Sequence, residues 1–168
     1  MTTKTIRFSL DTASVIRAIR EVEKYRDDLK NAIQQLVRTL TEDGREAAVM
    51  NVVGLGAFDT GELADTSFHT RGYYSSDYNI GIIYTDSYYA VFVEYGTGIV
   101  GLNGPQHPFL PAGWVHDHNN HGDKGWVYVS NRDGLFHWTK GQPSRPFMYQ
   151  TYMELIQMAQ QKLANLQI

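Results

Sequence analysis

The sequence predicts an α+β fold in which two amphipathic helices flank an antiparallel β-sheet. Apolar residues recur at helical spacing near both ends of the 168-residue chain, and β-branched and aromatic runs joined by turn sequences lie between them. This order of elements is typical of α+β domains. We therefore expect one domain (1–168) with a long N-terminal helix, an antiparallel β-sheet with a long inserted loop, and a C-terminal helix packed on the sheet.

The composition excludes several classes of protein. The net charge of -3 and the scattered basic residues argue against a protein whose main task is to grip phosphate backbones. The chain has no cysteine, which excludes disulfides and thiolate metal sites. It shows no signal-peptide pattern and no apolar run long enough to cross a membrane. We expect a protein that is made and used in a cytosol, or in a particle assembled there.

The first helix is predicted from Ser14 to about Leu40. Thr12 or Ser14 is its expected N-cap, and Arg26 interrupts the apolar stripe where the helix is expected to leave its support. Packing on the core is the expected role of this helix, and a coiled-coil partner is the alternative, which the short run of heptads disfavours. The apolar stripe consists of Val15, Ile19, Val22, Leu29, Ile33, Leu36 and Leu40.

Residues 54–72 are glycine-rich and polar. Gly54, Gly56 and Gly61 do not match a dinucleotide-binding fingerprint, because no helical pattern follows at the required place. A segment with so few apolar side chains cannot repay the entropy cost of ordering itself. We expect a mobile arm that becomes ordered only when subunits assemble.

A first β-hairpin is predicted from residues 78–84 and 88–95, joined by the turn sequence Thr85-Asp86-Ser87. The second strand is apolar on both faces but carries a carboxylate, Glu94, one residue before its end. A bare buried carboxylate is costly, so it needs a partner. We expect a bidentate pair with Arg145, and the alternative is that Glu94 reaches solvent or caps the Thr97 amide.

A second hairpin is predicted from residues 126–129 and 135–138, because Asp133-Gly134 is a strong tight-turn signal. Residues 99–125 separate the two hairpins. Their glycines, prolines and histidines predict a long irregular loop, and loops of this length are usually functional or mobile.

The last helix is predicted to open at Pro146, with Ser144 as a plausible cap. Its apolar stripe consists of Met148, Tyr152, Leu155, Ala159, Leu163 and Leu166.

The histidine-rich sequence HDHNNHGD contains the candidate metal ligands His116, His118 and His121. It is locally similar to the HxHxDH signature of the metallo-β-lactamase superfamily. However, Asn120 replaces the aspartate of that signature, and His137 is the one histidine left downstream. We therefore expect a solvated loop with no bound metal, and a metal-dependent hydrolase is the enzymatic alternative.

Other catalytic patterns are weaker. Asp65, Ser67 and His69 lie too close along the chain to predict a triad, whose members converge from separate elements. We expect neither a cofactor nor an enzymatic activity.

Three short motifs occur in order along the chain: TGELADTS (60–67), YYAVFVEYGTG (88–98) and RPFMYQTYMEL (145–155). This series resembles the phage tail-component family typified by gene product ten of phage HK-ninety-seven, whose members act as tail-completion or neck proteins. The loop at 99–125 is longer than a compact member needs. The matching positions are Thr60, Gly61, Leu63, Ser67, Tyr89, Ala90, Glu94, Tyr95, Gly96, Thr97, Arg145, Pro146 and Phe147.

The resemblance implies a structural protein of the virion neck, assembled in the cytoplasm of a bacterial host. Similar proteins form rings, commonly hexameric, that join the tail tube or its terminator protein to the head-completion or connector protein. The implied partners are thus other copies of this chain and these two neighbours, while DNA passes through the channel without specific binding and no membrane is involved. A tyrosine-rich adaptor domain unrelated to phage is the remaining alternative.

Overall fold

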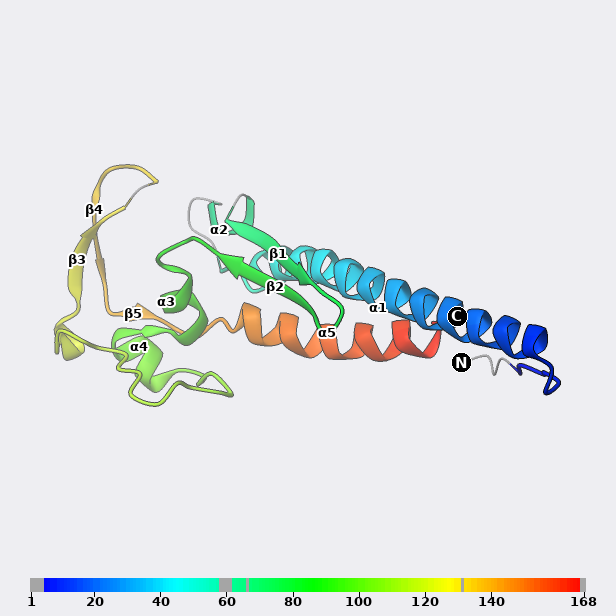
Figure 1. Ribbon diagram of the computed structural model, residues 1–168. Helices are drawn as coiled ribbons and strands as arrows, with labels where there is room; N and C mark the ends of the chain where they lie inside the picture. Colours follow the sequence, from blue (N-terminus) through cyan, green and yellow to red (C-terminus); the bar gives the residue numbers. More distant parts are fainter. Residues whose placement is uncertain (1–4, 58–61, 66, 131, 167–168) are drawn as a thin grey trace.

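The chain is built on a 43-residue helix, α1 (Thr12–Gly54), beside which a second helix, α5 (Phe147–Ala164), runs in the opposite direction (Figure 1). This computed structural model describes residues 5–57, 62–65, 67–130 and 132–166. The α+β class is confirmed, with a long N-terminal helix, antiparallel β-structure and a C-terminal helix. No helix among the described residues is long and apolar enough to cross a membrane.

Helix α1 begins one residue after its N-cap, Asp11, whose side chain accepts a hydrogen bond from the Ser14 amide at 2.9 Å. The prediction of Thr12 or Ser14 as the cap was wrong. Asp11 precedes the first turn, and from there its carboxylate reaches a backbone amide that has no partner within the helix. The helix ends at Gly54 rather than near residue 40. Residues 41–54 escaped prediction because small and polar residues, rather than an apolar stripe, form most of the buried positions there.

The core lies where the C-terminal half of α1 meets the start of α5. Asn51 of α1 donates hydrogen bonds to Thr151 Oγ1 at 3.1 Å and to Glu154 Oε2 at 3.2 Å. Farther along the helix pair, Lys162 forms an ion pair with Asp43 at 2.9 Å. These contacts fix the antiparallel alignment of the two helices. The contiguous core of buried apolar residues consists of Ala48, Val52, Ala57, Leu63, Phe68, Ala90, Val93 and Phe147.

The first hairpin consists of β1 (Phe68–Tyr74) and β2 (Asn79–Thr85), which pair in antiparallel register and lie along α1. Gly81 lets β2 approach the helix closely, because a Cβ there would collide with the side chain of Thr41. The predicted pairing of 78–84 with 88–95 was wrong, since 78–84 pairs with a strand from the segment assigned to the arm.

Residues 88–95 do not form a strand. They contain a short helix, α3 (Ala90–Tyr95), in which Ala90, Val93 and Glu94 are buried. This spacing of three and four residues is that of a helix face, and a short run that is apolar on all sides does not reveal it. Gly96, at φ 79°, ends α3 where a side chain would strike the backbone of residues 142–144.

Part of the segment that was predicted to be a mobile arm (54–72) forms regular secondary structure. Residues 62–65 form α2 (Glu62–Asp65), Leu63 is completely buried, and residues 68–72 belong to β1. The prediction of an unstructured segment is therefore wrong at these positions. Thr60, Gly61 and Thr66 lie outside the described residues, and a dependence of the arm on assembly stays a prediction.

The second hairpin agrees with the prediction within one residue. It consists of β3 (Trp126–Val129) and β4 (Phe136–Thr139), and it stands away from the two long helices (Figure 1). The short strand β5 (Gly141–Gln142) follows it and bridges to Thr97 and Gly98.

The long loop at 99–125 is irregular apart from its two ends. It opens within α4 (Gly98–Asn103) and closes with the single turn η1 (Gly122–Lys124).

Candidate functional site

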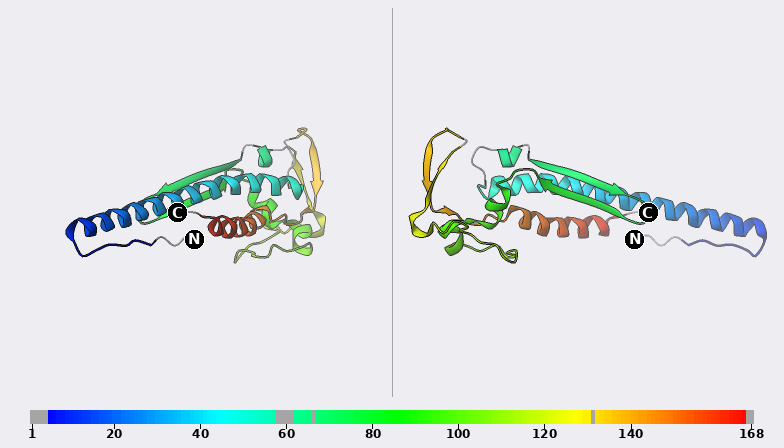
Figure 2. Two further views of the ribbon diagram at one scale, coloured as in Figure 1. Left: turned by 90° about the vertical axis from the view of Figure 1, so that its right-hand side faces the viewer. Right: turned by 60° about the vertical axis from the view of Figure 1, so that its left-hand side comes forward.

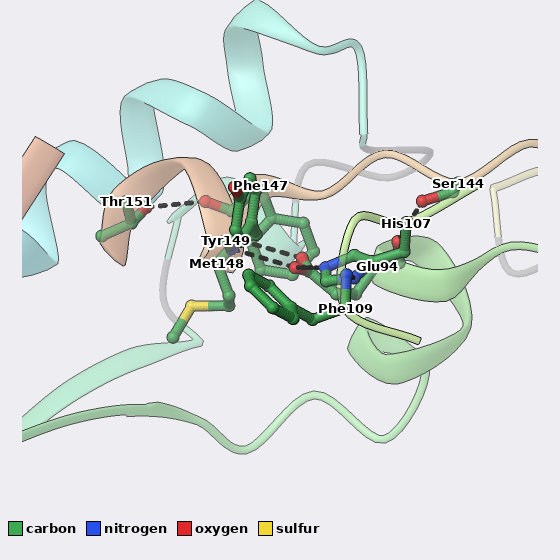
Figure 3. Close-up of polar contacts among 8 residues, drawn as sticks. All are labelled: Glu94, His107, Phe109, Ser144, Phe147, Met148, Tyr149 and Thr151. Atoms are coloured by element: carbon green, nitrogen blue, oxygen red, sulfur yellow. Dashed lines mark hydrogen bonds and ion pairs between the residues drawn. The ribbon is translucent and has the colours of Figure 1, made fainter. Parts of the chain in front are cut away.

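Glu94 is the centre of a buried polar cluster between α3 and the first turn of α5 (Figure 3). The residue is 5% exposed, and its carboxylate accepts hydrogen bonds from the Met148 and Tyr149 amides at 2.9 and 3.0 Å. The carboxylate thus lies at the N-terminus of α5, where free amides and the helix dipole favour a negative charge. Helix α5 has no acidic residue in its own first turn and no side-chain cap on Pro146. Glu94 supplies that cap from α3.

The third partner of Glu94 is His107, which is 6% exposed and places Nε2 2.9 Å from Oε1 of the carboxylate. The other ring nitrogen, Nδ1, accepts a hydrogen bond from the Phe109 amide at 2.9 Å. Because an accepting nitrogen carries no proton, this network assigns the proton to Nε2 and makes the imidazole a neutral donor. The negative charge is therefore compensated by amides and one imidazole rather than by a cation.

Tyr95 borders the same cluster, with its ring 4.6 Å from that of His107. Burial raises the pKa of the Tyr95 hydroxyl, and the charge of Glu94 raises it further. The hydroxyl is therefore held in its protonated form.

The predicted pair of Glu94 with Arg145 does not form. The Arg145 guanidinium donates to Gln142 Oε1 at 3.2 Å, while its backbone amide donates to the Val93 carbonyl at 2.9 Å. Ser144, the predicted cap of α5, instead donates its hydroxyl proton to the Glu94 carbonyl. The expectation that Glu94 ties its element to the start of the last helix was correct, but the partner was wrong.

Residues from the three sequence motifs meet around this cluster. The Tyr89 hydroxyl accepts a hydrogen bond from the Leu63 amide at 3.1 Å, which links α3 to α2. Thr97 bridges to Gln142, next to Arg145. Phe147 is 1% exposed and packs edge-on against Phe68 of β1. The motifs therefore mark one structural junction.

The histidine loop is organised by hydrogen bonds within the loop. Asp117 accepts from the His121 amide at 3.0 Å and from the Gly122 amide at 2.7 Å, and these bonds lower the pKa of its carboxyl group. The ring of His118 lies against Trp114, while His116 is buried with no hydrogen-bond partner at Nε2 among the described residues. Within the described ranges, no group of three or more acidic or histidine side chains is arranged to hold a metal ion.

An open groove of about 860 Å³ lies between α3, the histidine loop and the β3–β4 hairpin. Aromatic and aliphatic side chains from α3 and β3 line it together with a similar number of polar side chains, many of them from the histidine loop. Such a surface suits the binding of a polypeptide segment. Lining residues from these elements include Tyr89, Phe92, His116, Trp126, Val129 and Arg145.

The β3–β4 hairpin presents a bare apolar face. Val127 lies opposite Trp138 and Val129 opposite Phe136, so these four side chains share one face of the hairpin. Their exposed fractions are 60%, 59%, 54% and 79% in that order. Exposed apolar patches of this kind mark interaction sites. The sequence showed the strands but gave no sign that their apolar face would lack a cover.

Comparisons with protein-family models, with curated proteins and with solved structures found no match for this chain.

Proposed function

We propose that the protein is a structural component of the neck of a tailed double-stranded DNA phage. In this proposal, copies of the chain form a ring at the end of the tail tube and join it to the head connector. The order of the three motifs supports the phage assignment, and the bare apolar face of the β3–β4 hairpin carries the argument for assembly.

The hairpin face needs a cover because a two-stranded hairpin alone is marginally stable in water. Burying each of its large apolar side chains would contribute about 1.5–3 kcal/mol. The four side chains Val127, Val129, Phe136 and Trp138 contact water instead. A neighbouring subunit supplies the missing cover and stabilises the hairpin in its projecting position.

The shape of the subunit supports the same conclusion. Its accessible surface is 11359 Å², whereas a compact monomer of this mass exposes about 8,400 Å². The difference reflects an elongated subunit (Figure 2) with much surface available to neighbours.

The groove beside the hairpin is a second surface that a neighbouring subunit can occupy. A neighbour's segment lying in it would cover Val127 and Val129 of the hairpin together with Phe92 of α3. The inserted segment and the groove are different surfaces, and repetition of such a contact closes a ring or extends a filament. A net charge of -3 also suits a channel through which DNA slides without sticking.

The test is native mass measurement and negative-stain microscopy of the protein mixed with the tail-tube protein of the same phage. We expect rings on the tube ends, and we expect the double variant Phe136→Asp/Trp138→Asp to lose them. Tyr152→Asp is the matched control, because Tyr152 is an exposed aromatic residue on α5, outside the hairpin.

Two results would contradict the proposal. If the hairpin variant formed rings as readily as the unchanged chain, the hairpin would not be a ring contact. If no complex formed with the tube protein and the chain bound stoichiometric zinc, the hydrolase alternative would replace the neck function.

A further inference from the structure

The N-terminal half of α1 carries a seven-residue repeat whose positions are apolar except for Arg26. Successive positions are separated by three and four residues in turn, and the spacing continues without interruption. Such a repeat is the seam of a two-stranded coiled coil, with its members at alternating a and d positions. The seam positions from one end to the other include Ile19, Val22, Arg26, Leu29, Ile33 and Leu36.

Among the described residues, much of this seam is exposed, while Leu29 and Leu36 are half-buried. Helix α5 and the β1–β2 hairpin pack on the C-terminal half of α1, and the N-terminal half extends beyond both (Figures 1 and 2). Ile19 is 53% exposed, Val22 55% and Ile33 38%. Most of the stability of a helix in a protein comes from packing of its apolar face. This half of α1 therefore lacks its packing partner.

We infer that the partner is α1 of a second copy, and that the two helices form an antiparallel coiled coil with its two-fold axis between Asp27 and Asp28. In this register Val22 of each copy faces Ile33 of the other, and Ile19 faces Leu36. From Ile19 to Leu36 the seam is about 26 Å long at 1.5 Å per residue. These four apolar positions of each helix are thus met by apolar positions of its partner.

Arg26 decides against a parallel pair. In a parallel coil two Arg26 side chains would share one layer of the seam, and like charges would meet in an apolar setting. In the antiparallel register each Arg26 faces Leu29 of the other copy. Its guanidinium already turns towards Asp27, with Nη2 at 3.0 Å from Oδ1, and both groups are exposed. The charge can therefore remain in water at the edge of the seam.

The residues beside the seam fit the same register. Glu23 of each copy lies across from Lys30 of the other, which gives two symmetry-related ion pairs. On the opposite side, Tyr25 faces Ala32, a large residue against a small one. In a parallel coil neither Glu23 nor Lys30 meets a charged residue, because the positions across from them are Ala18 and Tyr25.

This inference goes beyond the proposed neck function and does not depend on it. The seam lies at the end of the molecule opposite the β3–β4 hairpin (Figure 1). A two-fold contact pairs the same surface of both copies, so it cannot by itself propagate a ring. The dimer is therefore the expected state of the free protein, whereas rings require the tube protein and the hairpin.

Sedimentation analysis of the full chain without tube protein tests the dimer. We expect the unchanged chain to dimerise, and we expect Ile19→Asp/Val22→Asp to weaken the dimer by at least about a hundredfold. Circular dichroism should show that this variant keeps its fold, since both side chains are more than half exposed. The control is Met50→Asp, an apolar residue of α1 that is 68% exposed but outside the seam. It should leave the dimer intact.

Charge reversal tests the orientation. Glu23→Lys and Lys30→Glu should each weaken the dimer roughly tenfold, because each change turns two attractive pairs into repulsive ones. The double reversal should restore the affinity to within about threefold. A chain that stays monomeric at about 100 µM, or a dimer that survives the seam variant, would overturn the proposal. A seam-dependent dimer that ignores these charges would overturn the antiparallel arrangement.

Discussion

The two halves of α1 have the same secondary structure but different surroundings. In the C-terminal half Ala48 and Val52 are completely buried, while in the N-terminal half Ile19 and Val22 are more than half exposed. Helical periodicity predicts the N-terminal half although nothing packs on much of its apolar stripe, because periodicity reports an apolar face and not what covers that face. The comparison shows that one helix can be covered by its own chain at one end and keep an exposed apolar stripe at the other.

Residue size distinguishes the two halves. At Gly44 an added Cβ would strike the side chains of Ile83 and Leu155, so the strand and the second helix approach α1 closely there. The N-terminal half has Ile, Val and Leu on its stripe, which suit the knobs-into-holes packing of a helix pair. Small buried residues thus mark the half that packs on its own chain.

The largest expected effect is the contrast between Val52→Asp and Val22→Asp. Val52→Asp places an unpaired charge in the core and should cost more than about 4 kcal/mol of unfolding free energy. Val22→Asp, in dilute monomeric protein, should change it by less than about 0.5 kcal/mol. Urea unfolding followed by circular dichroism measures both. Similar losses in the two variants would show that the N-terminal half is packed within its own chain.

Glu94→Gln should rank second, at about 3 kcal/mol, because the amide cannot accept all three hydrogen bonds and turns a donor towards one of the two backbone amides. Arg145→Met is the matched control and should cost less than about 1 kcal/mol, since Arg145 donates only to a neutral side chain through its guanidinium. Thermal unfolding at neutral pH compares the two. A larger loss of stability in Arg145→Met than in Glu94→Gln would indicate that Arg145 is the partner of Glu94 after all.

Asn51→Ala should have a moderate effect of about 1–2 kcal/mol, because it removes the hydrogen bonds that join α1 to Thr151 and Glu154 of α5. The loss should appear in the free energy of unfolding at concentrations where the chain is monomeric. An unchanged value would mean that apolar contacts alone align the two helices.

The smallest effect concerns Asp11, which caps the exposed half of α1. The hydroxyl of Ser9 and the amide of Ser14 lower the pKa of its carboxyl group from the usual 3.8. Because the pKa of Asp11 is lower in the folded protein than in the unfolded chain, the cap stabilises the helix fully at pH values above 3.8. This stabilisation is lost as the pH falls through the pKa of the folded state. Carbon-detected NMR titration should give a midpoint below 3.8. A midpoint at or above it would mean that the cap is not formed.

The sequence predicted the fold class, the presence of both long helices and the second hairpin, because long periodic segments and an Asp-Gly turn are strong local signals. It did not predict the first hairpin or α3. Residues 88–95 are apolar on every side, so their composition cannot distinguish a strand from a helix. Strand β1 contains His69, Arg71 and Gly72, which hid it within a polar segment.

The candidate site was predicted in part. The need of Glu94 for a partner followed from its charge and its apolar neighbours. The partner could not be read from the sequence, because two of the three donors are backbone amides, which every residue except proline carries. The third, His107, lies in a long loop whose path only the tertiary structure defines.

The central claim is that α1 is divided into a half that its own chain stabilises and a half that a second copy stabilises. Hydrogen exchange along α1, measured over a series of protein concentrations, tests it most directly. We expect the amides around Ala48 and Val52 to be protected equally at every concentration, and those between Ile19 and Ile33 to gain protection only as the dimer forms. Protection of both halves that is equal and independent of concentration would contradict the account.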